Sequence, residues 1–355
     1  MAQRAPEAAA TDVAELTQRI LDELGATGDR RLAQQLLESA LGLLTDRPHP
    51  LDLKIAGAAM TEMREAFGVF APLRDIQKAT IFGSARTKPD DPLYQQANKI
   101  AAHLAARGWL VVTGAGPGIM QAAMEGAGRD HSVGVAIRLP FEQGANPVIA
   151  GDDKYVAMRY FFTRKLMLVK ESRAFVCLPG GFGTLDETFE LLTLTQTGKG
   201  LPVPIILLDA PGAPFWAAID EMIQELLVGR GFVAPADRSL YLVTDSCEAA
   251  TAEIDRFYAN YHSIRYVGDN LVLRLQHQPT DAQLAELNER FGHLVARGRI
   301  ERAAPFDIER RHRDHEELPR IRFVFRGHRS GDLRALIDAV NGFVVAGSAP
   351  SNPVD

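Results

Sequence analysis

Hydrophobic and polar positions along the chain follow two different periods, and the change between them falls near Lys78. Before that point, apolar residues recur every three or four positions, which is the spacing of an amphipathic helix. This spacing predicts three helices, one over Val13 to Leu24, one over Leu32 to Leu43 and one over Leu51 to Phe67. Residues 1–75 are therefore expected to form a helical N-terminal region that packs on the core or on a partner subunit.

From Lys78 onwards, short apolar runs alternate with helical patterns. Such a run between turn residues is typical of a buried strand. The predicted strands cover 79–82, 109–112, 133–137, 174–178, 203–208 and 240–243, and the predicted helices cover 92–107, 119–126, 161–169, 184–196, 214–227 and 246–261. Alternation of strand and helix indicates a parallel sheet with helices on both faces. We expect residues 76–262 to form a Rossmann-like, doubly wound α/β domain.

Residues 263–355 are expected to form a separate, small α+β module. The predicted elements are strands over 270–275 and 320–325, a weaker strand near 299–303, and helices over 280–294 and 330–341. A β-α-β-β-α order suits a ferredoxin-like or ACT-like module. The sequence leaves open whether this module mediates dimerisation or senses a small ligand.

Composition narrows the class of protein. A formal net charge of −6 argues against a general affinity for nucleic acid. Two cysteines in 355 residues do not make a disulfide framework, which favours a reducing, cytoplasmic setting. The Ala-rich stretch from Met1 to Ala10 lacks the pattern of a secretory signal, and no apolar run is long enough to span a bilayer. We expect neither a nucleic-acid partner nor a membrane.

Three polar or glycine-rich turns each follow a predicted strand. In a parallel sheet such turns lie at the carboxyl edge, where ligands bind. Glycine lets the backbone approach a ligand closely, and N–H groups at a helix start bind phosphate or carboxylate. One such turn alone could reflect tight packing only, but three on one edge predict a phosphate-bearing ligand. The residues expected to bind it are Gly83, Ser84, Gly114, Gly116, Gly118, Gly180, Gly181, Gly183 and Thr184.

Several other nucleotide and metal sites do not fit the pattern. The turn from Gly114 to Gly118 lacks the third glycine of a dinucleotide-binding motif, because position 119 is Ile. The sequence contains no P-loop motif, and its nine histidines show no paired-ligand spacing. The site therefore appears suited to a mononucleotide, and we expect no metal and no cofactor.

Four motifs in order resemble one family. The segment Pro179-Gly-Gly-Phe-Gly-Thr-Leu-Asp-Glu187 resembles the PGGxGTxxE motif of the Lonely Guy (LOG) family. That family comprises the cytokinin riboside 5′-monophosphate phosphoribohydrolases and bacterial relatives, many of which have carried the label "lysine decarboxylase". The similarity continues in Arg159 to Met167, Thr113 to Met120 and Phe82 to Arg86, and it spans Ile81 to about Thr244.

The resemblance implies an enzyme that hydrolyses the N-glycosidic bond of a nucleoside 5′-monophosphate, either AMP or a cytokinin riboside monophosphate. Free base and ribose 5-phosphate would be the products. Glu187 matches the family's catalytic carboxylate and Arg164 its essential arginine, while Met158 and Lys165 are expected to bind substrate. The family resemblance also implies a homodimer or higher oligomer. No lysine lies in a recognisable Schiff-base context, so the decarboxylase label finds no support.

Two alternatives remain open from the residues themselves. Thr184 and Glu187 have the spacing of a capping box, so Glu187 could serve only to cap a helix. The protein could also be a nucleotide-binding sensor without catalysis, in which the C-terminal module transmits the signal. The sequence departs from the family pattern at two positions: Ala115 in place of a glycine is a small change, whereas Gln121 puts the identity of the substrate in doubt more than the activity.

Overall fold

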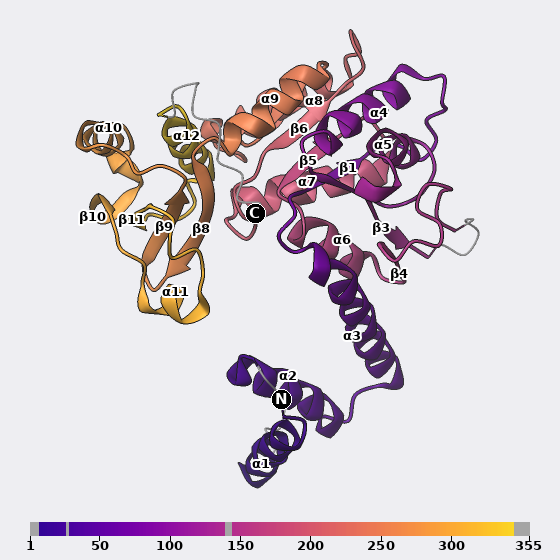
Figure 1. The fold of residues 1–355 in the computed structure, drawn as a ribbon, viewed down its shortest axis with the longest axis vertical. Coiled ribbons are helices and arrows are strands. Elements are labelled where there is room, and N and C mark those ends of the chain that lie inside the picture. Colours follow the sequence, from indigo (N-terminus) through magenta and orange to yellow (C-terminus); the bar gives the residue numbers. More distant parts are fainter. Residues whose placement is uncertain (1–6, 26–27, 139–143, 344–355) are drawn as a thin grey trace. The chain divides into compact units, whose positions relative to one another are not determined.

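The computed structural model describes residues 7–25, 28–138 and 144–343, and the chain divides into two compact units, residues 1–64 and 65–355 (Figure 1). The three predicted N-terminal helices are present as α1 (Glu7–Glu23), α2 (Arg30–Thr45) and α3 (Pro50–Phe70). The side chain of Asp29 caps α2 by accepting a hydrogen bond from the backbone N–H of Leu32. Helix α3 contains the limit between the two units.

A seven-stranded parallel sheet forms the centre of the second unit. Its strands are β1 (Lys78–Phe82), β2 (Leu110–Thr113), β3 (Ser132–Ile137), β4 (Tyr155–Met158), β5 (Ala174–Cys177), β6 (Ile205–Leu208) and β7 (Leu242–Thr244). They lie in the order β4-β3-β2-β1-β5-β6-β7. The chain builds outward from β1 in one direction and then returns to β5 on its other side, which is a doubly wound topology with its switch point between β1 and β5. The predicted Rossmann-like α/β fold is confirmed.

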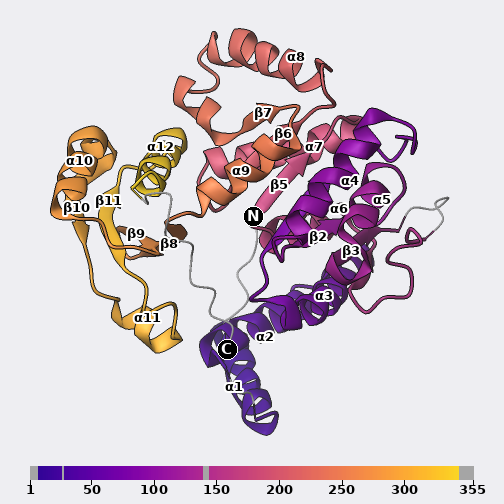
Figure 2. The same ribbon diagram turned by 45° about the horizontal axis from the view of Figure 1, so that its top comes forward.

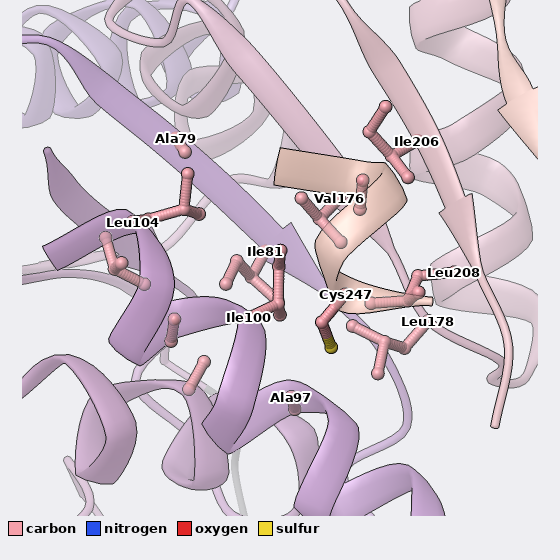
Figure 3. Packing of buried hydrophobic residues seen from close by; sticks show 14 of the residues in the cluster. Ala79, Ile81, Ala97, Ile100, Leu104, Val176, Leu178, Ile206, Leu208 and Cys247 are labelled. Atoms are coloured by element: carbon pink, nitrogen blue, oxygen red, sulfur yellow. The ribbon is translucent and has the colours of Figure 1, made fainter. Parts of the chain in front are cut away.

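Helices cover both faces of this sheet. They are α4 (Pro92–Ala105), α5 (Ile119–Ala127), α6 (Phe161–Lys170), α7 (Phe182–Gln196), α8 (Phe215–Met222), which continues as a π-helix over Ile223–Val228, and α9 (Cys247–Phe257). On one face, Ala79 and Ile81 of β1 pack against α4 and α9 (Figure 3). On the other face, the Thr80 hydroxyl donates to the Leu168 carbonyl oxygen of α6. Alternate residues of β1 thus serve opposite faces.

One strand of this domain was not predicted, and one predicted helix is too long at its end. Strand β4 is a short strand at the edge of the sheet, and its side chains alternate between buried and half-buried. Helix α9 ends at Phe257, whereas the pattern predicted that it would continue to Tyr261. The chain has already turned into the next strand at that residue.

The C-terminal elements form a second sheet, orange to yellow in Figure 2. They are β8 (Tyr261–Val267), β9 (Asn270–Leu275), α10 (Asp281–Phe291), β10 (Val295–Arg302), α11 (Asp307–His312), β11 (Arg320–Phe325) and α12 (Ser330–Asn341). The sheet order is β10-β11-β9-β8, and all pairs are antiparallel. Strands β9 and β10 flank β11, which is the split β-α-β arrangement of ferredoxin-like modules. The prediction missed β8 and α11.

Helix α12 joins this module closely to the α/β domain. The Ser330 hydroxyl donates to the carbonyl oxygen of Gln196 at 2.7 Å. The buried side chain of Asn341 accepts from the backbone N–H of Tyr261 at 2.7 Å and donates to the carbonyl oxygen of Phe257 at 2.7 Å. The domain limits predicted after residues 75 and 262 stay predictions. Within the described ranges, no helix has both the length and the apolarity needed to cross a membrane.

The close crossing of α4 and α5 gives a test of this packing. A Cβ added at Gly126 would overlap the backbone carbonyl of Asn98. We expect Gly126→Ala to lower the free energy of unfolding by about 1–3 kcal/mol, because overpacking forces a backbone shift. Gly68→Ala is the matched control, since its Cβ would meet nothing within 4 Å. Urea denaturation should show no loss of unfolding free energy for Gly68→Ala. An equal loss of unfolding free energy in the two variants would contradict this packing.

Candidate active site

The three predicted turns meet in one cleft of about 990 Å³ at the carboxyl edge of the sheet. They follow β1, β2 and β5, which are neighbours because β1 lies between the other two. This size falls at the upper end of the range for small-molecule sites. The predicted site residues that line the cleft are Gly83, Ser84, Gly114, Gly116, Arg164, Gly180, Gly181, Gly183, Thr184 and Glu187.

The backbone of Ser84 holds the three turns together. Its N–H donates to the carbonyl oxygen of Pro179 at 3.3 Å, in the turn after β5. Its carbonyl oxygen accepts from the N–H of Ile119 at 3.0 Å, at the start of α5. Gly118, with φ of +67°, packs so closely on Ser84 that a Cβ there would overlap the Ser84 carbonyl oxygen. The turns therefore form one connected floor, and glycine at 118 is required by both its φ and its neighbour.

Arg164 and Glu187 form a buried ion pair inside this cleft. Arg164 lies on α6 and Glu187 on α7, and Nη1 of the arginine is 3.2 Å from Oε1 of the carboxylate. The arginine Nε also donates to the carbonyl oxygen of Val135 at 3.0 Å. A Cβ at Gly114 would overlap Nη2 of Arg164, so the second turn makes room for the guanidinium. Arg164 is thus fixed by a strand end, a glycine turn and its carboxylate partner.

The environment of Glu187 changes its acidity. Burial raises the pKa of the Glu187 carboxyl above its ordinary value, while the positive charges of Arg164 and Lys165 act in the opposite direction. The burial effect is the larger one. Glu187 is therefore a stronger base than an exposed glutamate, and it becomes protonated at a higher pH than an exposed glutamate does. Perturbation of this kind in a cleft is common among functional residues.

The capping-box alternative for Glu187 is wrong. Helix α7 begins at Phe182 with Gly181 as its N-cap, not at Thr184. Thr184 is then the third helical residue, and Glu187 lies in the second turn, where it pairs with Arg164. Since Gly181 offers no side-chain cap, the first N–H groups of α7 remain available to an anion in the cleft.

Three predicted substrate-binding residues do not line the cleft. Met158 is fully buried on β4. Lys165 turns to α7, where its Nζ lies 2.7 Å from Asp186 and 2.8 Å from Glu190. Gly118 packs on the backbone of Ser84 and does not face the cleft itself. A direct contact of these three with substrate is therefore not what the geometry favours.

The two departures from the family pattern have different structural contexts. Ala115 lines the cleft with φ of +57°, in a conformation that costs a non-glycine residue roughly 1–2 kcal/mol. The Ala115 N–H donates to the Thr113 hydroxyl at 3.0 Å, which stabilises this turn. Gln121 instead donates to Glu125 at 2.8 Å and does not line the cleft. Its expected effect on the substrate is thus less direct than the sequence indicated.

The cleft residues that sequence reasoning did not predict include Arg86, Arg138, Tyr155 and Phe161. Arg138 directly follows β3, and Arg86 lies in the turn after β1, so each is at the carboxyl end of a strand. That position was the available signal for both arginines. Tyr155 begins β4, a strand that the sequence analysis did not predict.

Comparison with known proteins gives a consistent result. The family model described as "Possible lysine decarboxylase" matches residues 118–254. A probable cytokinin riboside 5′-monophosphate phosphoribohydrolase of Oryza sativa subsp. japonica is 26% identical over 178 residues, which cover 48% of this chain and 70% of that protein. A cytokinin riboside 5′-monophosphate phosphoribohydrolase of Mycobacterium marinum is 29% identical over 177 residues, or 48% of this chain and 89% of that protein.

Among solved structures, a molybdenum cofactor carrier protein from Chlamydomonas reinhardtii aligns with 51% of this chain and 97% of its own, at 20% identity and a TM-score of 0.35. The family model includes Glu187 and Arg164, the pair at the centre of the cleft. The match to the family model lies within the α/β domain and includes the glycine turn after β5. In this domain, the chain is similar to the cytokinin riboside 5′-monophosphate phosphoribohydrolases.

Proposed function

We propose that this protein hydrolyses the N-glycosidic bond of a nucleoside 5′-monophosphate and releases the free base and ribose 5-phosphate. The observation that carries the proposal is the buried Arg164–Glu187 pair in a cleft floored by three glycine-containing turns. The names of the relatives point to the same reaction, since both proteins are phosphoribohydrolases of a cytokinin riboside monophosphate.

A sensor without catalysis explains this cleft less well. Binding a phosphate requires the turns and a cation, but a carboxylate in the same cleft repels an anionic ligand. Glu187 is nevertheless buried there. A carboxylate in this position has a purpose if positive charge develops on the substrate during the reaction. Cleavage of an N-glycosidic bond creates such charge on the ribose ring, as glycoside hydrolysis does.

We propose separate tasks for the two ends of the cleft. The turn N–H groups and the first turn of α7 would hold the phosphate, and this remote binding would position the ribose. Arg164 contacts Oε1 of Glu187, and in the described part of the chain no donor reaches Oε2. Oε2 would then face C1′, stabilise the ribosyl cation and accept a proton from the attacking water. The water oxygen bonds to C1′ as the C1′–N bond breaks. The leaving base takes up a proton from solvent, and Glu187 then returns the proton that it accepted from the water to solvent.

Apolar side chains at the rim suit the base. Tyr155, Phe161, Phe182 and Met120 line the cleft, and Phe182 is 93% exposed. Aromatic faces bind a planar base by stacking, which tolerates different bases. Adenine, as in AMP, is the base that we propose to test first, together with its cytokinin derivatives.

We further propose a homodimer, or a higher oligomer, with the cleft close to the subunit contact. Phe161, Phe162 and Leu166 of α6 and Phe182 of α7 are all between 46% and 93% exposed. Large exposed apolar groups near a functional cleft often mark an interaction surface. A cytoplasmic location fits Cys177 and Cys247, which are both buried and unpaired with each other.

AMP is expected to release adenine, whereas adenosine is expected to react poorly. Without its phosphate, a nucleoside makes no charge-assisted hydrogen bonds to the turns. The loss of two such bonds should lower kcat/KM by roughly a hundredfold or more. Release of free base can be followed by chromatography on both substrates at equal concentration. Equal turnover of adenosine and AMP would remove the proposed role of the turns.

Glu187→Gln is expected to abolish base release while AMP still binds. Gln keeps the size of the side chain and can accept from Arg164, but it neither carries the negative charge nor takes a proton. We expect kcat and kcat/KM to fall together by about a hundredfold or more. Turnover should be measured beside AMP binding by calorimetry and a thermal melt. A folded, AMP-binding variant with near wild-type turnover would refute the catalytic assignment.

Dissociation to monomers should reduce activity if the cleft lies near a subunit contact. Phe162→Asp places a charge on the exposed apolar face of α6, outside the cleft lining, and should shift the protein to a smaller species in light scattering. Leu226→Asp, at a residue 42% exposed on the π-helix after α8, is the control and should leave the mass unchanged. A wild-type monomer that is fully active at high dilution would contradict the proposal.

A further inference from the structure

A second cavity lies at the edge of the sheet opposite the cleft. It has a volume of about 570 Å³ and is formed by the end of α3, the amino ends of β1, β5 and β6, and the start of β8. Lys78 is the first residue of β1, and Arg173 immediately precedes β5. Both residues lie at the amino ends of their strands, whereas the catalytic cleft lies at the carboxyl ends. The two linings have no residue in common.

Positive charge dominates the lining of this second cavity. Four cationic side chains, Arg74, Lys78, Lys170 and Arg173, face one carboxylate, Glu171, which gives an excess of three positive charges (4 − 1). The chain as a whole carries a net charge of −6. A local positive excess on an acidic protein concentrates anions at that point.

Internal partners use only part of this positive charge. Lys170 pairs with Glu171, and Lys78 donates to the carbonyl oxygens of Leu73 and Ile76. Arg74, by contrast, is exposed and has no hydrogen bond or ion pair among the residues that the structure describes. Its guanidinium could bind a carboxylate or phosphate with two hydrogen bonds.

One arginine and two tyrosine side chains form the inner wall of the cavity. The Arg173 guanidinium donates to the carbonyl oxygen of His262 and stacks 5.1 Å from the ring centre of Tyr258. Tyr261 lines the cavity and is only 2% exposed. In the described part of the chain, its hydroxyl has no hydrogen-bond partner, and this oxygen is not among the fully buried polar atoms, so it is accessible from the cavity. A ligand in the cavity could supply that partner.

We propose that this second cavity is a binding site for a small anionic molecule that carries phosphate or carboxylate groups on an apolar or aromatic body. Arg74, Lys170 and Arg173 bind the anionic groups, and the Tyr261 hydroxyl donates to one of them. Phe67 and Phe70 at the end of α3 contact the apolar body. The site is distinct from the cleft, and its occupation does not depend on any reaction there.

One helix connects the two sites. Helix α6 carries Arg164 in the catalytic cleft and Lys170 in the second cavity, six residues apart on the same ten-residue helix. Strand β5 likewise connects the two sites, because it begins directly after Arg173 and leads to the glycine turn that follows Leu178. An anion bound at Lys170 and Arg173 therefore acts on the two elements that place Arg164 and the phosphate-binding turn.

Calorimetric titration of the full chain with inorganic pyrophosphate, and separately with citrate, tests the proposal. We expect pyrophosphate to occupy two sites per chain, one in the cleft and one in the second cavity. The double variant Arg74→Glu, Lys170→Glu should lose the second site, with an affinity at least about tenfold weaker, because it reverses two charges. Arg164→Ala should weaken the cleft site and leave the second one. If only citrate binds the second cavity, the natural ligand carries carboxylates.

Matched controls separate a specific site from net charge and from misfolding. Lys99 is 50% exposed and ion-paired to Glu248, just as Lys170 is 50% exposed and paired to Glu171, so Lys99→Glu is the control and should change neither site. Tyr261→Phe removes only the unpartnered hydroxyl; it should melt like wild type and bind the second anion about threefold to tenfold more weakly. The proposal is overturned if neither anion binds outside the cleft, or if Lys99→Glu weakens binding as much as the double variant Arg74→Glu, Lys170→Glu does.

Discussion

The buried ion pair between Arg164 and Glu187 places the strictest demand on this structure. Removing two charges from water costs several kcal/mol per ion, and their attraction offsets this only when further hydrogen bonds complete the geometry. Here the carbonyl oxygen of Val135 accepts from the arginine, and Gly114 leaves space for the guanidinium. The pair thus requires that α6, α7 and the ends of β2 and β3 keep fixed positions. The rigidity of the cleft follows from that requirement.

Topology supplies the remaining precision. Because β1 lies between β2 and β5, the turns after these three strands are neighbours, although they are far apart in sequence. Ser84 then joins them through backbone hydrogen bonds to Pro179 and Ile119. Backbone contacts tolerate side-chain changes, but they do not tolerate a Cβ at Gly118 or Gly180, where it would overlap Ser84 or Thr184. A phosphate site built from backbone groups therefore depends on glycine at these positions more than on any particular polar side chain.

The sequence predicted the parallel sheet because buried apolar runs are a local signal, and the family resemblance pointed to Arg164 and Glu187 because both lie in compact motifs. It misplaced what depends on distant contacts. Strand β4 is short and lies at the edge, so only its pairing with β3 reveals it. Arg164 and Lys165 were both expected to lie at the site. Successive helical residues point about 100° apart, however, so only Arg164 faces the cleft. The start of α7 was misjudged because Gly181, Phe182 and Gly183 have the composition of a turn.

The cations at the opposite edge of the sheet have a simpler explanation that must be weighed. Helices end at the amino edge of a parallel sheet, and their C-terminal carbonyl groups attract positive charge. Lys170, the last residue of α6, fits that account, and Lys78 binds carbonyl groups of the 3₁₀ turn before β1. Arg74 does not fit this explanation, because no carboxylate or carbonyl oxygen among the described residues accepts a hydrogen bond from its guanidinium. Nor does helix electrostatics account for the Tyr261 hydroxyl, which lines the cavity and has no hydrogen-bond partner among the described residues. These two residues, rather than the total charge, are the reason to regard the second cavity as a ligand site.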